Sequence, residues 1–278
     1  MWFGTPEYMV EVPDPAINYD ASRVGWEGKS QYLNGGAAIR RSTASHREYN
    51  FSWNLQAYEN VRPIMDFADG VYGPGPFYFV DWFAAKQNVL PQHLATPALA
   101  IDDAPVLVGE ARPIAVRTNA NTNGYPLMSA RYTVKPSDPR LSTFVPIPPG
   151  YSLWMGVHGY AGTGGRVEVL PVFPGGTVGP PITVPIYGVT SRDRVYRSFD
   201  GDAYVGAYVR LNGEGTITLS GIMGQLLKNG ESPQIGGFIS GQGNGGCLFE
   251  SQPTLTHYSA VMNKVGLNAK LVETEPWA

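Results

Sequence analysis

Residues 47–55 read REYNFSWNL and indicate the fold class, because they alternate without a break between two kinds of side chain. The first kind is large and apolar: Tyr49, Phe51, Trp53 and Leu55. The second kind is polar: Glu48, Asn50, Ser52 and Asn54. Successive side chains of a β-strand point to opposite faces, so this period of two predicts a half-buried strand over Arg47–Leu55.

The pattern changes to a helical period directly after this strand. The apolar residues of Tyr58–Ala68 are spaced i, i+3, i+4 and i+7: Val61, Ile64, Met65 and Ala68. This spacing predicts a short amphipathic helix. Pro63 would then lie in the first turn, where its missing N–H costs nothing. Gly70 and the GPGP run of residues 73–76 would end the helix.

Short strand patterns occupy most of the remaining chain. Before residue 105 they are Glu7–Val12 and the aromatic segment Phe77–Phe83, and one or two helical turns are expected at Ala84–Leu90. From about residue 105 the predicted strands are Arg112–Thr118, Leu127–Val134, Tyr151–Val157, Arg166–Val172, Ile182–Tyr187, Arg194–Phe199, Ala203–Leu211 and Gly215–Leu227. Three more follow near the end: Cys247–Phe249, Leu255–Tyr258 and Leu267–Val272. Strands at roughly 8–12 residue spacing, separated by turn residues, predict a mainly β protein whose residues 105–240 form a β-sandwich.

The composition agrees with a mainly β chain. Gly (34) and Pro (24) break helices and make up about a fifth of the 278 residues, while hydrophobic residues at 43% supply a core. Only 15% of residues are charged and the net charge is −3, which argues against non-specific binding to nucleic acid. The single cysteine, Cys247, excludes an intramolecular disulfide and a cysteine-cluster metal site. We expect no signal peptide and no membrane span, because no basic leader and no run of about 18 apolar residues occurs.

Residues that could carry chemistry form no convincing motif. The four histidines, which lie outside any HExxH pattern, are His46, His93, His158 and His257. Gly241, Gly243 and Gly246 satisfy GxGxxG, but the strand-like CLFESQPTL follows where a nucleotide site needs a helix, so we expect a chain reversal. Asp200 and Asp202 lack the glutamate of a calcium loop and predict a hairpin turn. Asp102–Asp103 is expected to end a strand or form a turn. We therefore predict no catalytic residue, no cofactor site and no metal ligand.

The aromatic residues of the middle region leave two interpretations open. They are Tyr151, Trp154, Tyr160, Tyr187, Tyr196, Tyr204 and Tyr208. They could form a flat platform for sugars, or they could pack the sandwich and its interfaces, which we favour. The sequon at Asn50–Ser52 lies inside the first predicted strand and is expected to be a chance match.

Three segments together resemble a known family. The first is RRSTASHREYNFSWNL (residues 40–55) with its helix, and the second is PFYFVDWF (residues 76–83). The third comprises GNGGCLFESQPTLTHYSAV (residues 243–261) and LNAKLVETEPW (residues 267–277). They resemble the distal tail proteins, most closely the minor tail proteins of long-tailed phages of actinobacteria. The resemblance covers roughly residues 1–100 and 240–278. The middle is similar only in its general pattern of short strands and turns, which is that of galectin-like or carbohydrate-module sandwiches.

The resemblance implies a structural protein of the virion tail tip, assembled in the host cytoplasm, with no enzymatic activity. Such proteins form a homohexameric ring that contacts the tail tube protein on one side and the tail hub or other minor tail proteins on the other. Residues 1–104 would be the ring-forming domain, to which residues 241–278 would return, with Leu267–Trp277 beside the first strands. Residues 105–240 would then be an inserted sandwich.

Two further functions remain as alternatives. The sandwich could be a carbohydrate-binding or receptor-binding module that attaches the tail to a host cell-surface glycan. An envelope-degrading enzyme ranks last, because the sequence carries no recognisable catalytic constellation. The small polar face of Arg47–Leu55 suits edge pairing between copies in a ring, and the low charge with many aromatics suits permanent interfaces.

Overall fold

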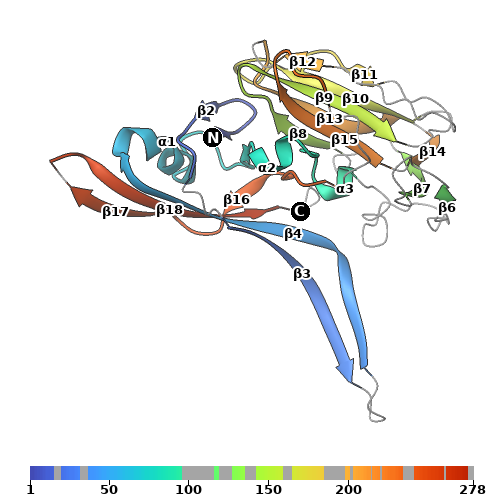
Figure 1. Ribbon diagram of the computed structural model, residues 1–278, viewed down its shortest axis with the longest axis horizontal. Coiled ribbons are helices and arrows are strands. Elements are labelled where there is room, and N and C mark those ends of the chain that lie inside the picture. The colour runs from blue at the N-terminus through green and yellow to red at the C-terminus, as the bar shows by residue number, and fades with distance from the viewer. Residues whose placement is uncertain are drawn as a thin grey trace.

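The computed structural model describes residues 1–15, 20–31, 37–95, 116–118, 127–134, 142–158, 165–184, 198–200, 203–213, 215–219, 221–233, 241–259 and 261–274. Antiparallel sheets and a few short helices make up its regular structure, which confirms the predicted mainly β class (Figure 1).

The first sheet is built around β4 (Ala37–Ala57), which contains the strand predicted from the alternating segment. β4 pairs with β3 (Asp20–Gln31) along its first part and with β18 (Lys264–Glu273) along its second part. The other edge of β18 carries β16 (Cys247–Phe249) and β17 (Thr254–Ser259). We call these five strands the long sheet. Its middle strands come from near the two ends of the chain.

The alternation of β4 continues to Trp53 and fails at Leu55. Tyr49, Phe51 and Trp53 are at most 3% exposed, whereas Leu55 is 62% exposed. The register against β18 shifts between Trp53 and Gln56, and Leu55 has a φ of 54°. A β-bulge inserts one extra residue at this point and turns the following side chain. The prediction that Leu55 lies on the apolar face is therefore wrong.

Helix α1 covers the apolar face of the long sheet and spans Tyr58–Ala68, as predicted. It buries Val61, Ile64 and Phe67 against the aromatic residues of β4. Pro63 lies in the second turn, so its predicted place in the first turn is wrong. The helix begins earlier than Pro63 requires because the chain turns directly from β4 into α1.

The aromatic segment after α1 is only partly a strand. Three short strands form a second small sheet beside the same aromatic core: β2 (Met9–Glu11), β1 (Trp2–Gly4) and β5 (Tyr78–Phe79). The predicted strand Phe77–Phe83 is wrong beyond Phe79. The Asp81 carboxylate accepts hydrogen bonds from the Phe83 and Ala84 N–H groups at 2.9 and 3.4 Å. This cap starts α2 (Trp82–Ala85), so the sequence turns helical before the aromatic run ends.

Two further sheets, which we call the paired sheets, bury a common core. One has the order β11 (Ile182–Val184), β10 (Gly165–Val172), β13 (Gly206–Gly213) and β8 (Ser142–Pro146). The other has the order β12 (Ser198–Asp200), β9 (Tyr151–His158) and β15 (Gly221–Lys228). A small third sheet joins β14 (Gly215–Leu219), β7 (Leu127–Val134) and β6 (Val116–Thr118).

Strand predictions in this region succeed unevenly. β7 coincides with the predicted Leu127–Val134, and β9 and β10 differ from their predictions by one residue. The single strand predicted over Gly215–Leu227 is wrong, because its two halves become β14 and β15 in different sheets. Parts of the predicted strands Arg112–Thr118, Ile182–Tyr187 and Arg194–Phe199 lie outside the described residues.

A segment from before residue 105 completes the core of the paired sheets. Its buried side chains are Val80, Ala85, Val89, Leu90, Leu94 and Ala95, the last two in α3 (Gln92–Ala95). The predicted helical turns at Ala84–Leu90 end with α2. Beyond that point, the Val89 N–H donates to the Gly224 carbonyl at 2.9 Å and the Asn88 side chain donates to the Ile222 carbonyl at 3.0 Å. These bonds attach the segment to the edge of β15.

Candidate functional site

The glycine-rich segment Gly241–Gly246 lies between the long sheet and the paired sheets, and it forms a closely packed junction. The Gln242 N–H donates to the Asn88 carbonyl at 2.9 Å and the Gly243 N–H donates to the Leu90 carbonyl at 3.1 Å. A Cβ on Gly243 would lie 1.6 Å from the Val89 carbonyl oxygen. The glycines are thus needed for close backbone approach, in addition to the chain reversal predicted from the sequence.

Arg47 holds this segment from the side of the long sheet. Its guanidinium donates to the carbonyls of Gly241 at 3.1 Å and Gly243 at 3.2 Å, and also to the carbonyl of Gln242. Arg47 is only 8% exposed. One arginine therefore satisfies three consecutive backbone carbonyls, those of Gly241, Gln242 and Gly243.

Glu273, at the end of β18, completes the junction. Its carboxylate accepts hydrogen bonds from the backbone N–H groups of Arg47 at 3.1 Å and Gly245 at 2.6 Å. Burial, and then the Glu273 charge, raise the pKa of the Cys247 thiol well above its usual value, although Arg47 opposes this. The Cys247 side chain is fully buried and stays protonated, so it is unsuited to act as a nucleophile.

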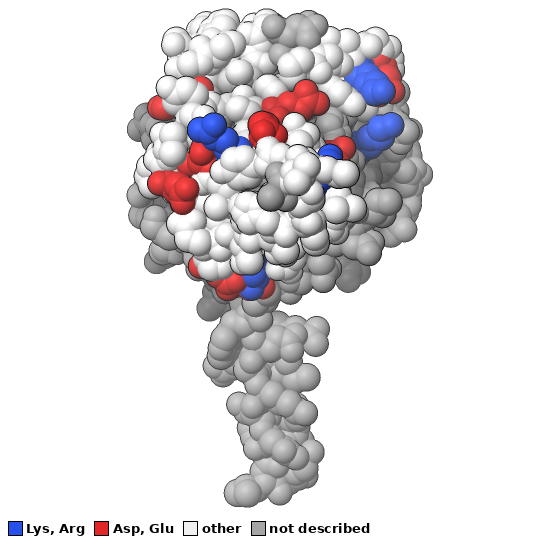
Figure 2. All heavy atoms as spheres, turned by 90° about the vertical axis from the view of Figure 1, so that its left-hand side faces the viewer, with Lys and Arg blue, Asp and Glu red and all other residues white. Residues whose placement is uncertain are grey.

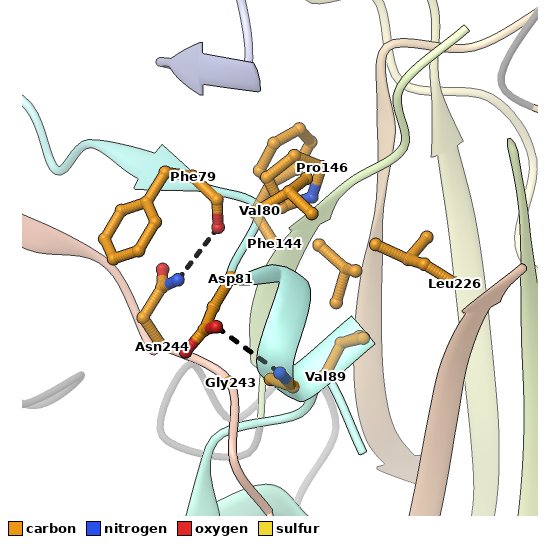
Figure 3. Close-up of a pocket in the computed structure, with 11 residues that line it drawn as sticks. Phe79, Val80, Asp81, Val89, Phe144, Pro146, Leu226, Gly243 and Asn244 are labelled. Atoms are coloured by element: carbon orange, nitrogen blue, oxygen red, sulfur yellow. Dashed lines mark hydrogen bonds between the residues drawn. The ribbon is translucent and has the colours of Figure 1, made fainter. Parts of the chain in front are cut away.

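A small cavity lies beside this junction (Figure 3). The Asn244 side chain donates to the Phe79 carbonyl at 2.9 Å, with Asp81 beside it and Leu226 across the cavity. The space holds about one water molecule, which is too little for a substrate or an organic cofactor. The arrangement of Arg47, Glu273 and Asn244 accordingly explains how the long sheet and the paired sheets are joined.

The described residues among the candidate histidines and acidic residues of the sequence form no common site. His257 is exposed on β17, and the side chains of His46, His93 and His158 lie outside the described residues, as do Asp102, Asp103 and Asp202. Asn50 is exposed on β4. Within the described part of the chain, no three His, Cys, Asp or Glu side chains are grouped to hold a metal. No described helix is long and apolar enough to span a membrane.

The described aromatic residues of the middle region occupy separate places. The Tyr151 ring contacts Trp82, the Tyr204 ring contacts Phe173, and the Tyr208 ring contacts Phe144. Tyr160, Tyr187 and Tyr196 lie outside the described residues. Each of these three described rings thus packs against another aromatic ring.

Sequence reasoning missed a polar cluster on the paired sheets, which we call the arginine cluster. Its members are Arg166 and Glu168 of β10, and Arg210 and Asn212 of β13. Glu168 is 1% exposed although it carries a carboxylate. The Arg210 Nε and the Asn212 Nδ2 each donate to its Oε2 at 2.8 Å, and the Arg166 Nε donates to its Oε1. The sequence does contain a signal for this cluster. Arg166 and Glu168 are two residues apart, as are Arg210 and Asn212, so each pair lies on one face of its strand.

Exposed apolar side chains gather at the other end of the molecule, near the turn between β17 and β18. Val261 is 98% exposed, Met262 72% and Tyr258 53%. Leu55, turned outward by the bulge, precedes Gln56, which pairs with Val265 close to the same turn. Figure 2 views the molecule from the side of α1 and this turn, and it shows a mainly uncharged surface with small groups of charges.

Comparison with protein families, with curated proteins and with solved structures finds no match for this chain. The proposals below therefore rest on the residues, the geometry and the resemblance of the sequence segments.

Proposed function

We propose that this chain is a structural protein of a phage tail tip, in which copies form a ring between the tail tube and the tail hub. In this proposal the long sheet and α1 build the ring, and the paired sheets are a sandwich of the galectin-like or carbohydrate-module type that projects from it. The resemblance of residues 1–100 and 240–278 supports this assignment. The observation that carries it is the arm, by which we mean residues 24–31 of β3 and residues 37–46 of β4.

The arm is a two-stranded hairpin that extends away from the rest of the molecule (Figure 1). Its register runs from Val24 opposite His46 to Gln31 opposite Ala37, and in the described residues this part of β4 pairs with β3 alone. An isolated two-stranded hairpin is marginally stable in water, and both of its outer edges offer unpaired N–H and C=O groups. Neighbouring copies in a closed ring would supply the missing partners.

Two surface features agree with contact between copies. The apolar group of Leu55, Tyr258, Val261 and Met262 is open to solvent in the single chain. A strained left-handed φ at an exposed leucine is unfavourable by itself and is often associated with a functional site. The mainly uncharged surface in Figure 2 also suits a permanent interface, which is more apolar than a transient one.

The test is the mass of the assembled protein with and without the arm. Because Val24 lies opposite His46, replacing residues 25–45 by Asn-Gly closes the hairpin with a two-residue turn. We expect the full chain to give rings of about six copies of the 30.1 kDa chain in native mass spectrometry and electron microscopy. The shortened chain should be a monomer that still unfolds in a single cooperative transition followed by tryptophan fluorescence.

Two results would overturn the proposal. One is a full chain that remains monomeric at all concentrations and when mixed with tail tube protein. The other is a shortened chain that assembles as well as the full chain. A variant with Val261→Ser and Met262→Ser, which keeps the arm, separates the contribution of the apolar turn from that of the arm.

A further inference from the structure

The arginine cluster has a geometry that ordinary surface ion pairs lack. Val167 and Val169 of β10 and Val209 and Leu211 of β13 are fully buried in the core of the paired sheets. Residues alternate across a strand, so Arg166, Glu168, Arg210 and Asn212 lie on the outer face. Glu168 stands directly opposite Arg210, and Arg166 directly opposite Asn212. The carboxylate is thus surrounded by three donors on one patch of sheet.

The buried carboxylate orients both arginines through one nitrogen each. Arg166 and Arg210 approach Glu168 with Nε, and neither guanidinium has another partner within the described part of the chain. A guanidinium has five N–H donors, so the terminal amino groups of both have no partner among the described residues. Arg166 is 55% exposed and Arg210 23%, whereas Glu168 is 1% exposed. Both arginines are therefore more open to solvent than the carboxylate that they contact.

The charge of the cluster is also unbalanced. Two guanidinium groups face one carboxylate, which leaves a local charge of about +1 on a chain whose net charge is −3. An arginine guanidinium binds a carboxylate or phosphate group through two parallel N–H···O bonds. A side chain that is already held in position loses less entropy when the ligand binds. Burial alone would raise the pKa of Glu168, but the hydrogen bonds from Asn212, Arg210 and Arg166 outweigh it and lower this pKa, so the carboxylate stays charged near neutral pH.

We propose that Arg166 and Arg210, held in place by Glu168 and Asn212, form a binding site for an oxyanion group, either a carboxylate or a phosphodiester of a cell-envelope polymer. The site goes beyond the ring function and does not depend on it. Only the origin of the ligand, a host cell envelope, depends on the alternative function in which the sandwich attaches the tail to the host. It also changes the chemistry expected for that alternative from aromatic stacking on neutral sugars to charge-assisted hydrogen bonding.

The experiment measures binding of the full chain to three polymers by isothermal titration calorimetry at about 0.15 M salt, where long-range attraction is screened. The probes are polygalacturonate, which carries carboxylates, polyglycerol phosphate, which carries phosphodiesters, and neutral dextran. We expect binding to one or both of the anionic polymers and none to dextran. Binding to polygalacturonate would identify the bound group as a carboxylate, and binding to polyglycerol phosphate would identify it as a phosphodiester.

Four variants connect the binding to the cluster. Arg166→Gln should weaken it at least tenfold, and Arg166→Lys should restore only part of it, because lysine keeps the charge and loses the planar fork. Arg210→Gln should weaken binding as well, provided that its circular dichroism spectrum is unchanged. The matched control is Arg62→Gln on α1, an arginine that is 63% exposed and pairs with Asp66 at 3.4 Å. This control should bind like the unaltered chain.

The proposal is overturned if neither anionic polymer binds at millimolar concentration of its repeat units. Equal binding by Arg166→Gln, Arg62→Gln and the unaltered chain would overturn it as well. Native mass spectra of the same samples report the ring separately, so loss of the ring and loss of the oxyanion site are distinguishable.

Discussion

At the scale of single residues, Arg47 connects three parts of the chain that are distant in sequence. It belongs to β4, its guanidinium holds Gly241–Gly243, and its backbone N–H is held by Glu273. Buried backbone carbonyls need hydrogen-bond partners, and a segment rich in glycine has few side chains to provide them. Arg47 is therefore more important for stability than its place beside an aromatic strand pattern suggests.

Arg47→Ala should lower the free energy of unfolding by about 3 kcal/mol, because it leaves three carbonyls of the junction without their donor. Urea unfolding followed by tryptophan fluorescence measures the change. Arg62→Ala, which removes an exposed arginine of α1, should change the same quantity by no more than about 0.5 kcal/mol. Equal effects of the two substitutions would contradict the role given to Arg47.

Glu168 gives the protein a dependence of stability on acid. Its pKa is lower in the folded protein than its usual value of 4.5, so the unfolded chain binds the proton more readily. The stability that the carboxylate contributes is therefore fully present above about pH 4.5 and is lost as the pH falls through the lower, folded pKa. Urea unfolding between about pH 7 and pH 3 should show the unaltered chain losing its advantage over Glu168→Gln in this range. A constant difference at every pH would refute the assignment.

At the scale of elements, β18 is the strand on which the long sheet depends. It lies between β4 on one side and β16 and β17 on the other. Alternate residues of β18 point to the aromatic core under α1 and to the polar face. On the polar face Lys270 lies between Glu48 at 2.9 Å and Glu250 at 2.8 Å, and such exposed pairs add little stability.

Two adjacent residues of β18 test this division between faces. Leu267 is fully buried, so Leu267→Ala should lower the free energy of unfolding by about 2–5 kcal/mol. Asn268, the next residue, is exposed on the opposite face, and Asn268→Ala should change it by no more than about 0.5 kcal/mol. Similar losses for both substitutions in chemical denaturation would show that the face assignment of β18 is wrong.

The glycine-rich segment offers a second test at this scale. Gly243→Ala places a Cβ against the Val89 carbonyl and should cost about 3 kcal/mol or more, or prevent folding. Gly230→Ala is the control, because Gly230 has a φ of +90° but open space around its Cβ position, so only about 1 kcal/mol of backbone strain is expected. Soluble yield and thermal midpoint compare the two. A Gly243→Ala protein as stable as the control would argue against close packing at the junction.

At the scale of the whole molecule, the two halves of the fold are packed against each other. The segment Val80–Ala95 follows the strands near the N-terminus but buries its side chains among β9, β10, β13 and β15. The glycine-rich segment then returns the chain to the long sheet beside it. The long sheet and the paired sheets are thus joined at a packed, hydrogen-bonded junction.

We expect the chain to unfold in one cooperative transition for this reason. Calorimetry, far-ultraviolet circular dichroism and tryptophan fluorescence should report the same midpoint. Leu94→Ala, in the segment that completes the core of the paired sheets, should lower that midpoint for all three probes together. Two separated transitions, or a Leu94→Ala effect on only one probe, would show that the two parts unfold independently.

The local elements with a strong period were predictable from the sequence. The structure confirms the strand at Arg47–Leu55 and the helix at Tyr58–Ala68. Both were predictable because the spacing of apolar residues changes from two to about 3.6 between neighbouring segments. The predictions fail where hydrogen bonds made in the folded chain outweigh the local pattern of apolar residues. The bulge opposite β18 turns Leu55 outward, and the Asp81 cap converts the end of an aromatic run into α2.

The local sequence pattern is enough to predict the mainly β class and the change from strand to helix after residue 57, and it contains no recognisable catalytic motif. Three features become visible only in the folded chain: β18 lies beside β4, Arg47 binds a glycine segment almost two hundred residues away, and Arg166 and Arg210 both bind Glu168. The physical reason is that periodicity and turn chemistry act between near neighbours, whereas strand pairing and buried hydrogen bonds join residues that no local pattern relates.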